Sequence, residues 1–339
     1  MDDRKRAGQC THANQRRRNH YDVTDRVRIC DPRDVLSCVR GILQRLDADL
    51  DTTPLARAFA IFGQLYAGLL PNYVGCDTQY HDAQHSLDCA LAMARLIDGH
   101  ERSAPAADRL GGERLLLGLI VALFHDAGYI RRADESTSHG AEHTLRHVRR
   151  SGDFLAALLP QLGFGESVPL IRQLVHFTGF EIALDRIDVV NRKDRMLGFL
   201  IGTADFLAQT ADRCYPEKCR DFLFPEFVIC GLAGNGSLVR DTPICRTADE
   251  LLVNTPAFVE QFWRERLDGY FEGVYRYMDA HFGGSNPYLA EIQRNLRRLD
   301  TIGQPQAAPL NRRPRAICAA SLRHLLSQKP GSGADLSLQ

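Results

Sequence analysis

Residues 115–126 read Leu-Leu-Leu-Gly-Leu-Ile-Val-Ala-Leu-Phe-His-Asp, an uncharged apolar run that ends in a histidine and an aspartate. This run predicts a buried helix, and it is too short to cross a lipid bilayer. An ionised carboxylate at the rim of a buried helix is unfavourable unless a positive charge compensates it. Imidazole and carboxylate together suit a divalent metal ion. The pair His125–Asp126 therefore indicates a metal site at the end of this helix.

Two other segments supply further candidate ligands. Residues 80–85, Tyr-His-Asp-Ala-Gln-His, place His81 and His85 one helical turn apart, so the two imidazoles share a face. Asp205 lies among apolar residues in a helical stretch, and Asp212, two turns further along, is an alternative to it. The resulting set of candidate metal ligands is His85, His125, Asp126 and Asp205.

This ligand set has a chemical consequence. Mixed His and Asp ligation favours an ion with positions open to water over a closed structural zinc. Asp126 has two oxygens and can bridge two ions, which at about 3.5–4 Å apart would clamp a phosphate and activate a water molecule. The leaving alkoxide needs an acid, and His81 is the candidate. The pattern thus indicates phosphoester hydrolysis with one or two divalent ions (Fe, Mn, Zn or Mg) as cofactor.

Apolar residues recur at helical spacing through most of the chain, whereas strand-like alternation is nearly absent. We predict an all-α domain of roughly ten helices over residues 31–301, with one extended piece at residues 187–190. Residues 1–30 are predicted to form a mobile polar tail, and residues 302–339 a loosely ordered tail with one short helix. The predicted helices are centred on residues 35–43, 55–69, 84–97, 113–127, 138–151, 168–177, 193–214, 216–230, 255–281, 287–299 and 316–326.

The composition narrows the classes of partner. The chain has 42 basic and 42 acidic residues, so its charge gives no reason to expect a nucleic acid polymer or an anionic membrane as partner. Its first residues lack the apolar core of a signal peptide, and we expect a cytoplasmic protein. The 10 cysteines are scattered, which predicts free and mostly buried thiols. The sequence does not determine the oligomeric state.

Two of these motifs resemble a known family. Residues 80–88, Tyr-His-Asp-Ala-Gln-His-Ser-Leu-Asp, resemble the YHNxxHAxDV signature of the 3′,5′-cyclic-nucleotide phosphodiesterases. Residues 122–126, Ala-Leu-Phe-His-Asp, resemble their second signature and that of the HD-domain metal-dependent phosphohydrolases generally. The similarity in helical order extends over about residues 55–300.

The resemblance implies a phosphodiesterase-like helical bundle and a nucleotide-like phosphoester substrate, with a cyclic nucleotide as the leading candidate. It implies that His81 donates the proton to the leaving group. It also implies that Asp126 reaches a second ion, whose other ligands are largely water. The first ion would be held by His85, His125, Asp126 and Asp205.

The chain departs from the phosphodiesterase pattern at three places. Asp82 stands where the family has Asn, and Tyr129 stands where it has a further His. The family also holds the purine with a Gln near a Phe, to which Gln261-Phe262 is only a loose match. The metal-binding residues are therefore better matched than the residues that would recognise a cyclic nucleotide.

Other residues carry weaker expectations. On the predicted helix 138–151, His139 and His143 are candidates for contacts around the metal or for a further ion, and we expect His147 to serve packing. His176 is a similar candidate, and Gln209, one turn from Asp205, is a possible substrate contact. The pair Arg131-Arg132 suggests either a phosphate contact or a solvated loop.

Two other functions remain open at this point. Some HD-fold proteins use the same ligands for oxygen chemistry, so a di-iron oxygenase is the first alternative. A regulatory module that binds a nucleotide without turning it over is the second, because Asp82 and Tyr129 alter the motif.

Overall fold

The computed structural model describes residues 18–234, 243–302 and 310–328. These residues form an all-α fold without a β-strand, as the spacing of apolar residues predicts. None of the described helices is long and apolar enough to cross a membrane. The helices are α1 (Pro32–Leu46), α2 (Thr53–Ala67), α3 (Ala83–Ser103), α4 (Gly112–Phe124), α5 (His147–Leu158), α6 (Val168–Leu174), α7 (Arg192–Thr210), α8 (Tyr215–Lys218), α9 (Phe224–Ile229), α10 (Ala248–Phe262), α11 (Tyr277–Phe282), α12 (Pro287–Asp300) and α13 (Ala319–Ser327).

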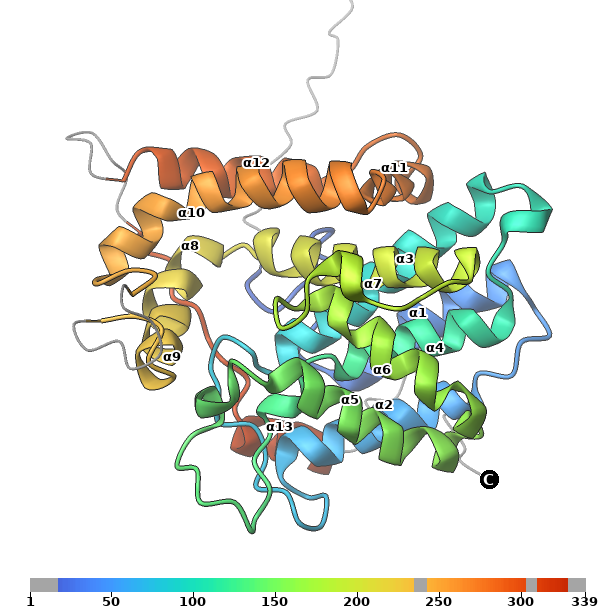
Figure 1. The fold of residues 1–339 in the computed structure, drawn as a ribbon, viewed down its shortest axis with the longest axis horizontal. Helices are drawn as coiled ribbons and strands as arrows, with labels where there is room; N and C mark the ends of the chain where they lie inside the picture. Colours follow the sequence, from blue (N-terminus) through green and yellow to red (C-terminus); the bar gives the residue numbers. More distant parts are fainter. Residues whose placement is uncertain (1–17, 235–242, 303–309, 329–339) are drawn as a thin grey trace, which may run out of the picture.

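Helix α3 is the central element of the bundle. It packs against α1, α4, α7 and α11, and every residue from Ala83 to Glu101 is buried. In Figure 1, α3, α4 and α7 lie between α10 and α12 on the upper side and α2, α5 and α13 on the lower side. A helix covered on all sides must pair its charged side chains. Arg95 accordingly donates to Asp22 at 2.5 Å and to the Tyr288 hydroxyl at 2.8 Å.

Helix α4 contains the apolar run that ends in His125 and Asp126. All residues from Leu115 to Phe124 are buried, which confirms the predicted buried helix. Gly118 allows α4 to approach its neighbours closely, because a Cβ atom there would lie 2.6 Å from Leu197 of α7 and 2.7 Å from Met93 of α3. The end of α4 is thereby fixed against the two helices that carry the other candidate ligands.

Three predicted elements differ in the structure. The predicted helix 138–151 is broken, because Arg146 has a non-helical φ of −139° and α5 begins only at His147. The predicted helix 255–281 is interrupted by a left-handed turn at Glu272 (φ 55°) and Gly273 (φ 70°). The predicted extended piece at residues 187–190 forms no strand.

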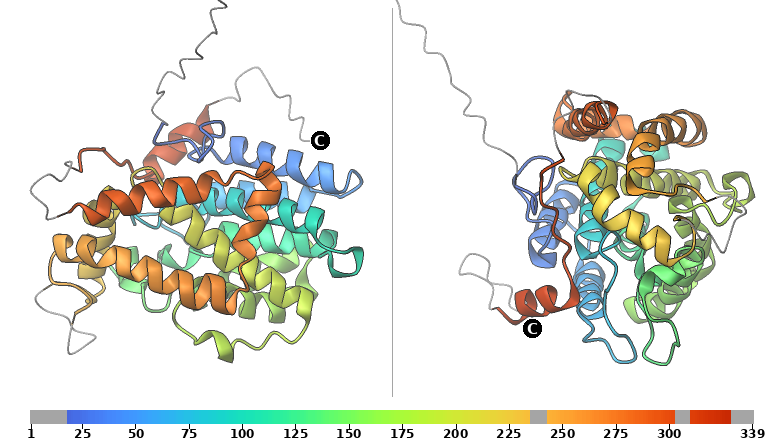
Figure 2. Two further views of the ribbon diagram at one scale, coloured as in Figure 1. Left: turned by 90° about the horizontal axis from the view of Figure 1, so that it is seen from above. Right: turned by 90° about the vertical axis from the view of Figure 1, so that its left-hand side faces the viewer.

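Both predicted tails are shorter than the sequence suggests. Asp22 and Ile29 are buried, so residues 18–30 belong to the folded domain, whereas residues 1–17 lie outside the described part. At the other end, residues 310–318 run along the outside of the bundle to α13, which packs on α2 (Figure 2). This segment is anchored by the backbone N–H of Ile317, which donates to Asp82 Oδ2 at 2.6 Å. Buried partners from distant segments hold both ends, and local patterning does not reveal them.

The contact between α3 and α11 gives a stability prediction. A Cβ atom on Gly99 would overlap the backbone carbonyl of Tyr277, which cannot move without shifting α11. We expect Gly99→Ala to destabilise the fold by about 3 kcal/mol, at the upper end of the cost of overpacking. The measurement is the midpoint of urea unfolding at constant m-value.

Gly152→Ala is the matched control, because its added Cβ would lie 3.4 Å from Val175 in ordinary contact. Since alanine is the better helix former, this variant should be neutral or stabilised by up to about 1 kcal/mol. Equal stability of the two variants would contradict the close packing of α3 on α11.

Candidate metal centre

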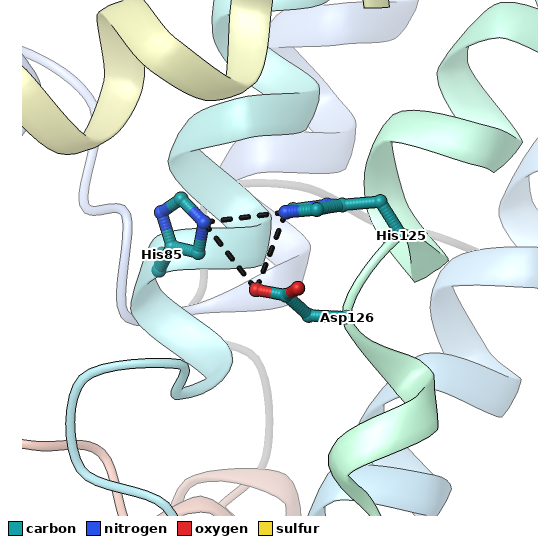
Figure 3. A group of neighbouring side chains, drawn as sticks. All are labelled: His85, His125 and Asp126. Carbon is teal, nitrogen blue, oxygen red and sulfur yellow. Dashed lines mark hydrogen bonds and ion pairs between the residues drawn. The ribbon is translucent and has the colours of Figure 1, made fainter. Parts of the chain in front are cut away.

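Four polar side chains converge where α3, α4 and α7 meet. His85 Nε2 of α3 lies 3.2 Å from His125 Nε2 and 3.1 Å from Asp205 Oδ1 of α7. Asp126 Oδ2 lies 3.4 Å from His85 Nε2 and 3.2 Å from His125 Nε2. Figure 3 shows the two imidazoles and the Asp126 carboxylate pointing toward one another. The structure thus brings together all four of the predicted ligands.

The spacing of these atoms fits a bound cation. Ligands about 2.1 Å from a metal ion are separated by about 3.0 Å at a right angle and about 3.4 Å at a tetrahedral angle. The separations between His125 and the two carboxylates, 3.2 and 3.4 Å, lie in this interval. Asp126 Oδ2 is buried and has no hydrogen-bond donor among the described residues. A buried oxygen of this kind requires a positive partner, and a divalent ion would supply it.

The backbone sets the orientation of His125. Its Nδ1 lies 2.9 Å from the carbonyl oxygen of Ala122 and donates a hydrogen bond there, so Nε2 faces the other ligands. Burial alone would lower the pKa of His125, but Asp126 and Asp205 hold it well above its usual value. In the absence of an ion, His125 therefore keeps a proton between the carboxylates. Metal binding must displace that proton, and its affinity should rise with pH.

The carboxylates stay ionised despite their burial. Burial raises the pKa values of Asp126 and Asp205, but the positive charge of His125 lowers them more. Both pKa values therefore lie far below the usual value for an aspartate. Asp205 also accepts a hydrogen bond from Gln209 Nε2 at 3.1 Å. The other end of that amide accepts from the Tyr80 hydroxyl at 3.2 Å. Gln209 therefore orients Asp205, and its role as a possible substrate contact stays a prediction.

Asp82 places His85 at the start of α3. Its Oδ1 accepts the backbone N–H of His85 at 3.0 Å and caps the helix, while Oδ2 accepts from Ile317. An aspartate suits this position because it accepts at both oxygens. Asp82, which stands where the phosphodiesterase signature has Asn, thus caps α3 and anchors the segment at Ile317.

His81 stands next to the ligands and is held by a residue that the sequence analysis missed. Its Nδ1 lies 2.6 Å from Glu226 Oε2, and Glu226 Oε1 accepts the backbone N–H groups of Gln79 and Tyr80, each at 2.7 Å. Burial would lower the pKa of His81, but the Glu226 charge raises it above the usual value. Glu226 is the one charged residue in the apolar run 222–229, which is the pattern that marked Asp126.

His147 also lies at the centre, although the sequence favoured a packing role. Its Nδ1 donates to the carbonyl of Thr144 at 2.6 Å, and its Nε2 faces Asp126 Oδ1 at 3.8 Å. Burial lowers the pKa of His147 to about 4, so the ring is neutral at pH 7. The ring of Tyr129 stacks on those of His147 and His81, with centroid distances of 4.5 and 4.3 Å, and the two imidazoles lie 6.2 Å from each other. Tyr129 therefore holds two imidazoles in place of the histidine that the family pattern carries.

Cys89 is a further neighbour that the sequence analysis missed. It follows His85 by four residues, and its thiol, His125 and Asp205 lie close enough to form a second potential metal-binding group. Burial raises the pKa of Cys89 to about 11, which keeps the thiol protonated at neutral pH. The spacing of four residues on one helix was a sequence signal for this contact.

Two of the weaker histidine candidates serve elsewhere. His139 Nδ1 accepts the backbone N–H of Ala141 at 3.1 Å and caps a short turn, and His139 does not join either potential metal-binding group. His143 Nε2 pairs with Glu135 at 3.1 Å. The break between this turn and α5 separates both residues from the face that His147 occupies.

The remaining candidates also lie outside the ligand group. His176 is buried with no partner for Nδ1 among the described residues, and it does not join either potential metal-binding group. Asp212 pairs with Lys218 at 2.7 Å, which leaves Asp205 as the ligand. Gln261 bonds to Glu265 on the exposed surface and is not placed to hold a base.

No protein-family model matches the chain, and no curated protein matches it significantly. The site therefore has to be interpreted from its own geometry.

We expect Asp126→Asn to weaken binding of Mn²⁺ or Zn²⁺ by at least about 100-fold. Changing a residue that only hydrogen-bonds to a metal ligand lowers metal affinity by about 10- to 100-fold, and loss of a ligand itself should cost more. The measurement is metal content after dialysis against the ion, by mass spectrometry. His139→Asn is the control, since asparagine can also cap a turn and His139 lies outside the ligand group. Equal metal content in both variants would rule out ligation by Asp126.

The pair of His81 and Glu226 gives a pH prediction. Because the pKa of His81 is raised, the folded protein keeps the imidazolium charge at low pH. The ion pair with Glu226 therefore stabilises the folded state at low pH, and this contribution is lost as pH rises through the pKa of His81. Glu226→Gln removes the negative charge and leaves the burial, so the pKa of His81 should fall below its usual value. An NMR titration of the ring measures this shift.

Glu265→Gln is the control for the charge effect, because Glu265 is exposed and pairs with Arg264. The His81 titration should be unchanged in this variant. An unchanged titration in Glu226→Gln as well would show that Glu226 does not set the protonation of His81.

Proposed function

We propose that this protein is a metal-dependent phosphohydrolase of the HD-domain class that cleaves a nucleotide-like phosphoester. One observation carries the proposal: His81, paired with the buried carboxylate of Glu226, lies beside a separate group of His and Asp ligands. Phosphoester hydrolysis needs charge stabilisation at the phosphoryl group and a proton for the leaving oxygen. The two neighbouring sets of side chains are suited to these two tasks.

The ligand group would hold one ion, and Asp126 and His147 offer further atoms on its open side. A divalent ion bound there would supply Lewis acidity toward a phosphoryl oxygen and would activate a water molecule. His81 would donate its Nε2 proton to the leaving oxygen, because Nδ1 is committed to Glu226. Glu226 stabilises the imidazolium, so His81 can be protonated again after each turnover.

A cyclic nucleotide is the leading substrate within this proposal. The support is the resemblance of residues 80–88 and 122–126 to the phosphodiesterase signatures. Tyr129 and the outward position of Gln261 depart from that family, so the substrate screen should extend to other phosphodiesters and to phosphomonoesters.

The test is hydrolysis by the full chain reconstituted with Mn²⁺, Fe²⁺ or Zn²⁺. The substrates are bis(p-nitrophenyl) phosphate, p-nitrophenyl phosphate and 3′,5′-cyclic nucleotides. We expect metal-dependent turnover that falls about 10²–10⁴-fold in His81→Asn, the range for loss of a general acid. Metal content should be unchanged in that variant, and His139→Asn should keep wild-type turnover.

Other results would overturn the proposal. Iron-dependent visible absorbance with oxygen consumption and no hydrolysis would identify an oxygenase. Tight binding of a nucleotide without product release, at full metal content, would identify a binding module. Turnover that is unaffected by His81→Asn would remove His81 from the mechanism.

A further inference from the structure

Arg266 is a half-buried arginine in an unusual environment. It belongs to the π-helical segment Trp263–Tyr270 that continues α10, and such segments are frequent at functional sites. Its guanidinium carbon lies 3.9 Å from the ring centroid of Phe180 and 5.2 Å from that of Phe262. The side chain is thus held against two aromatic rings.

The guanidinium of Arg266 is not paired with a carboxylate. Its hydrogen bond goes to the carbonyl of Gly179, from Nη1 at 2.9 Å, and no described carboxylate oxygen lies within ion-pair distance. Burial lowers the pKa of Arg266 to about 10, and the more distant charge of Asp205 opposes this shift only in part. A half-buried guanidinium without an anion is unfavourable, and four of its five N–H donors remain available.

A continuous set of contacts links Arg266 to the metal ligands. Phe262 stacks on Phe206 with a centroid distance of 4.0 Å and an interplanar angle of 6°, and Phe206 follows Asp205 on α7. Gly179, which accepts the hydrogen bond from Arg266, lies two residues before Glu181, whose Oε1 is 4.0 Å from His147 Nδ1. An anion bound by Arg266 would therefore lie near the centre.

The arginines that the sequence suggested for phosphate binding are unsuitable by comparison. Arg131 pairs with Asp77 at 2.9 Å, and Arg132 pairs with Asp134 at 3.0 Å. Both guanidinium groups already have a carboxylate, whereas Arg266 does not.

We propose that Arg266 is a substrate-binding residue whose guanidinium contacts the phosphoryl oxygens of the substrate at the edge of the metal centre. This inference rests on the proposed function, since it assigns a further group to the same site. A planar guanidinium stacked on Phe180 is already oriented, so it loses little freedom when it binds two oxygens. The residue supplies binding and orientation, and it takes no part in proton transfer.

The test is binding of inorganic phosphate to the Mn²⁺-reconstituted full chain, measured by titration calorimetry. Arg266→Met keeps an apolar stem against Phe180 but removes the charge. We expect phosphate affinity to fall about 10- to 100-fold, the range for losing hydrogen bonds from a charged group, with unchanged metal content. Arg266→Lys keeps a charge without the planar fork, and we expect an intermediate loss.

Arg264→Met is the matched control. Arg264 lies in the same π-helical segment but is exposed and pairs with Glu265, so phosphate affinity should be unchanged. The hydrolysis assay gives a second measurement, in which Arg266→Met should raise KM more than it lowers kcat.

The outcomes separate this inference from the proposed function. Wild-type hydrolysis with equal phosphate affinity in Arg266→Met and Arg264→Met would overturn the role of Arg266 and leave the hydrolase intact. No hydrolysis and no phosphate binding by the metal-loaded wild type would overturn the proposed function. If Arg266→Met lowers the melting temperature strongly, its phosphate affinity is no longer informative, and Arg266→Lys becomes the deciding variant. Wild-type phosphate affinity in Arg266→Lys would contradict recognition by a planar guanidinium.

Discussion

Two buried carboxylates facing two imidazoles are the constraint on which this structure depends. Asp126 and Asp205 keep their charge inside a helical bundle, and Asp126 Oδ2 makes no hydrogen bond within the described part of the chain. Like charges at such short range in a low-dielectric interior repel unless a cation lies between them. In the metal-free chain a proton on His125 provides that charge, and a divalent ion would provide it more completely.

The helices around the centre are arranged to hold these groups still. Helix α3 is buried on every side, and α4 packs closely on it at Gly118, so the candidate ligands are carried by closely packed helices in the core. Residues around the ligands fix their orientation further. Asp82 caps the turn that carries His85, Ala122 directs His125, and Gln209 bonds to Asp205. Ligands supported in this way lose little freedom on binding an ion.

The side chains beside the ligands come from more distant segments. Glu226 of α9 reaches His81 across 145 residues of sequence, and Tyr129 stacks on both His81 and His147. Arg266 comes from the segment that continues α10. The candidate metal ligands therefore lie on α3 and α7 and at the end of α4, whereas Glu226 and Arg266 come from α9 and from the segment that continues α10.

The sequence by itself determined the helical class, the buried run of α4 and the four candidate ligands, because helical period and isolated charges in apolar runs are local signals. Only the tertiary structure decided the rest. It showed that His147 lies at the centre and His143 does not, because the predicted helix is interrupted at Arg146 and α5 begins only at His147. It also paired Glu226 with His81 and left Arg266 without a carboxylate, since contacts between distant segments depend on how the helices pack.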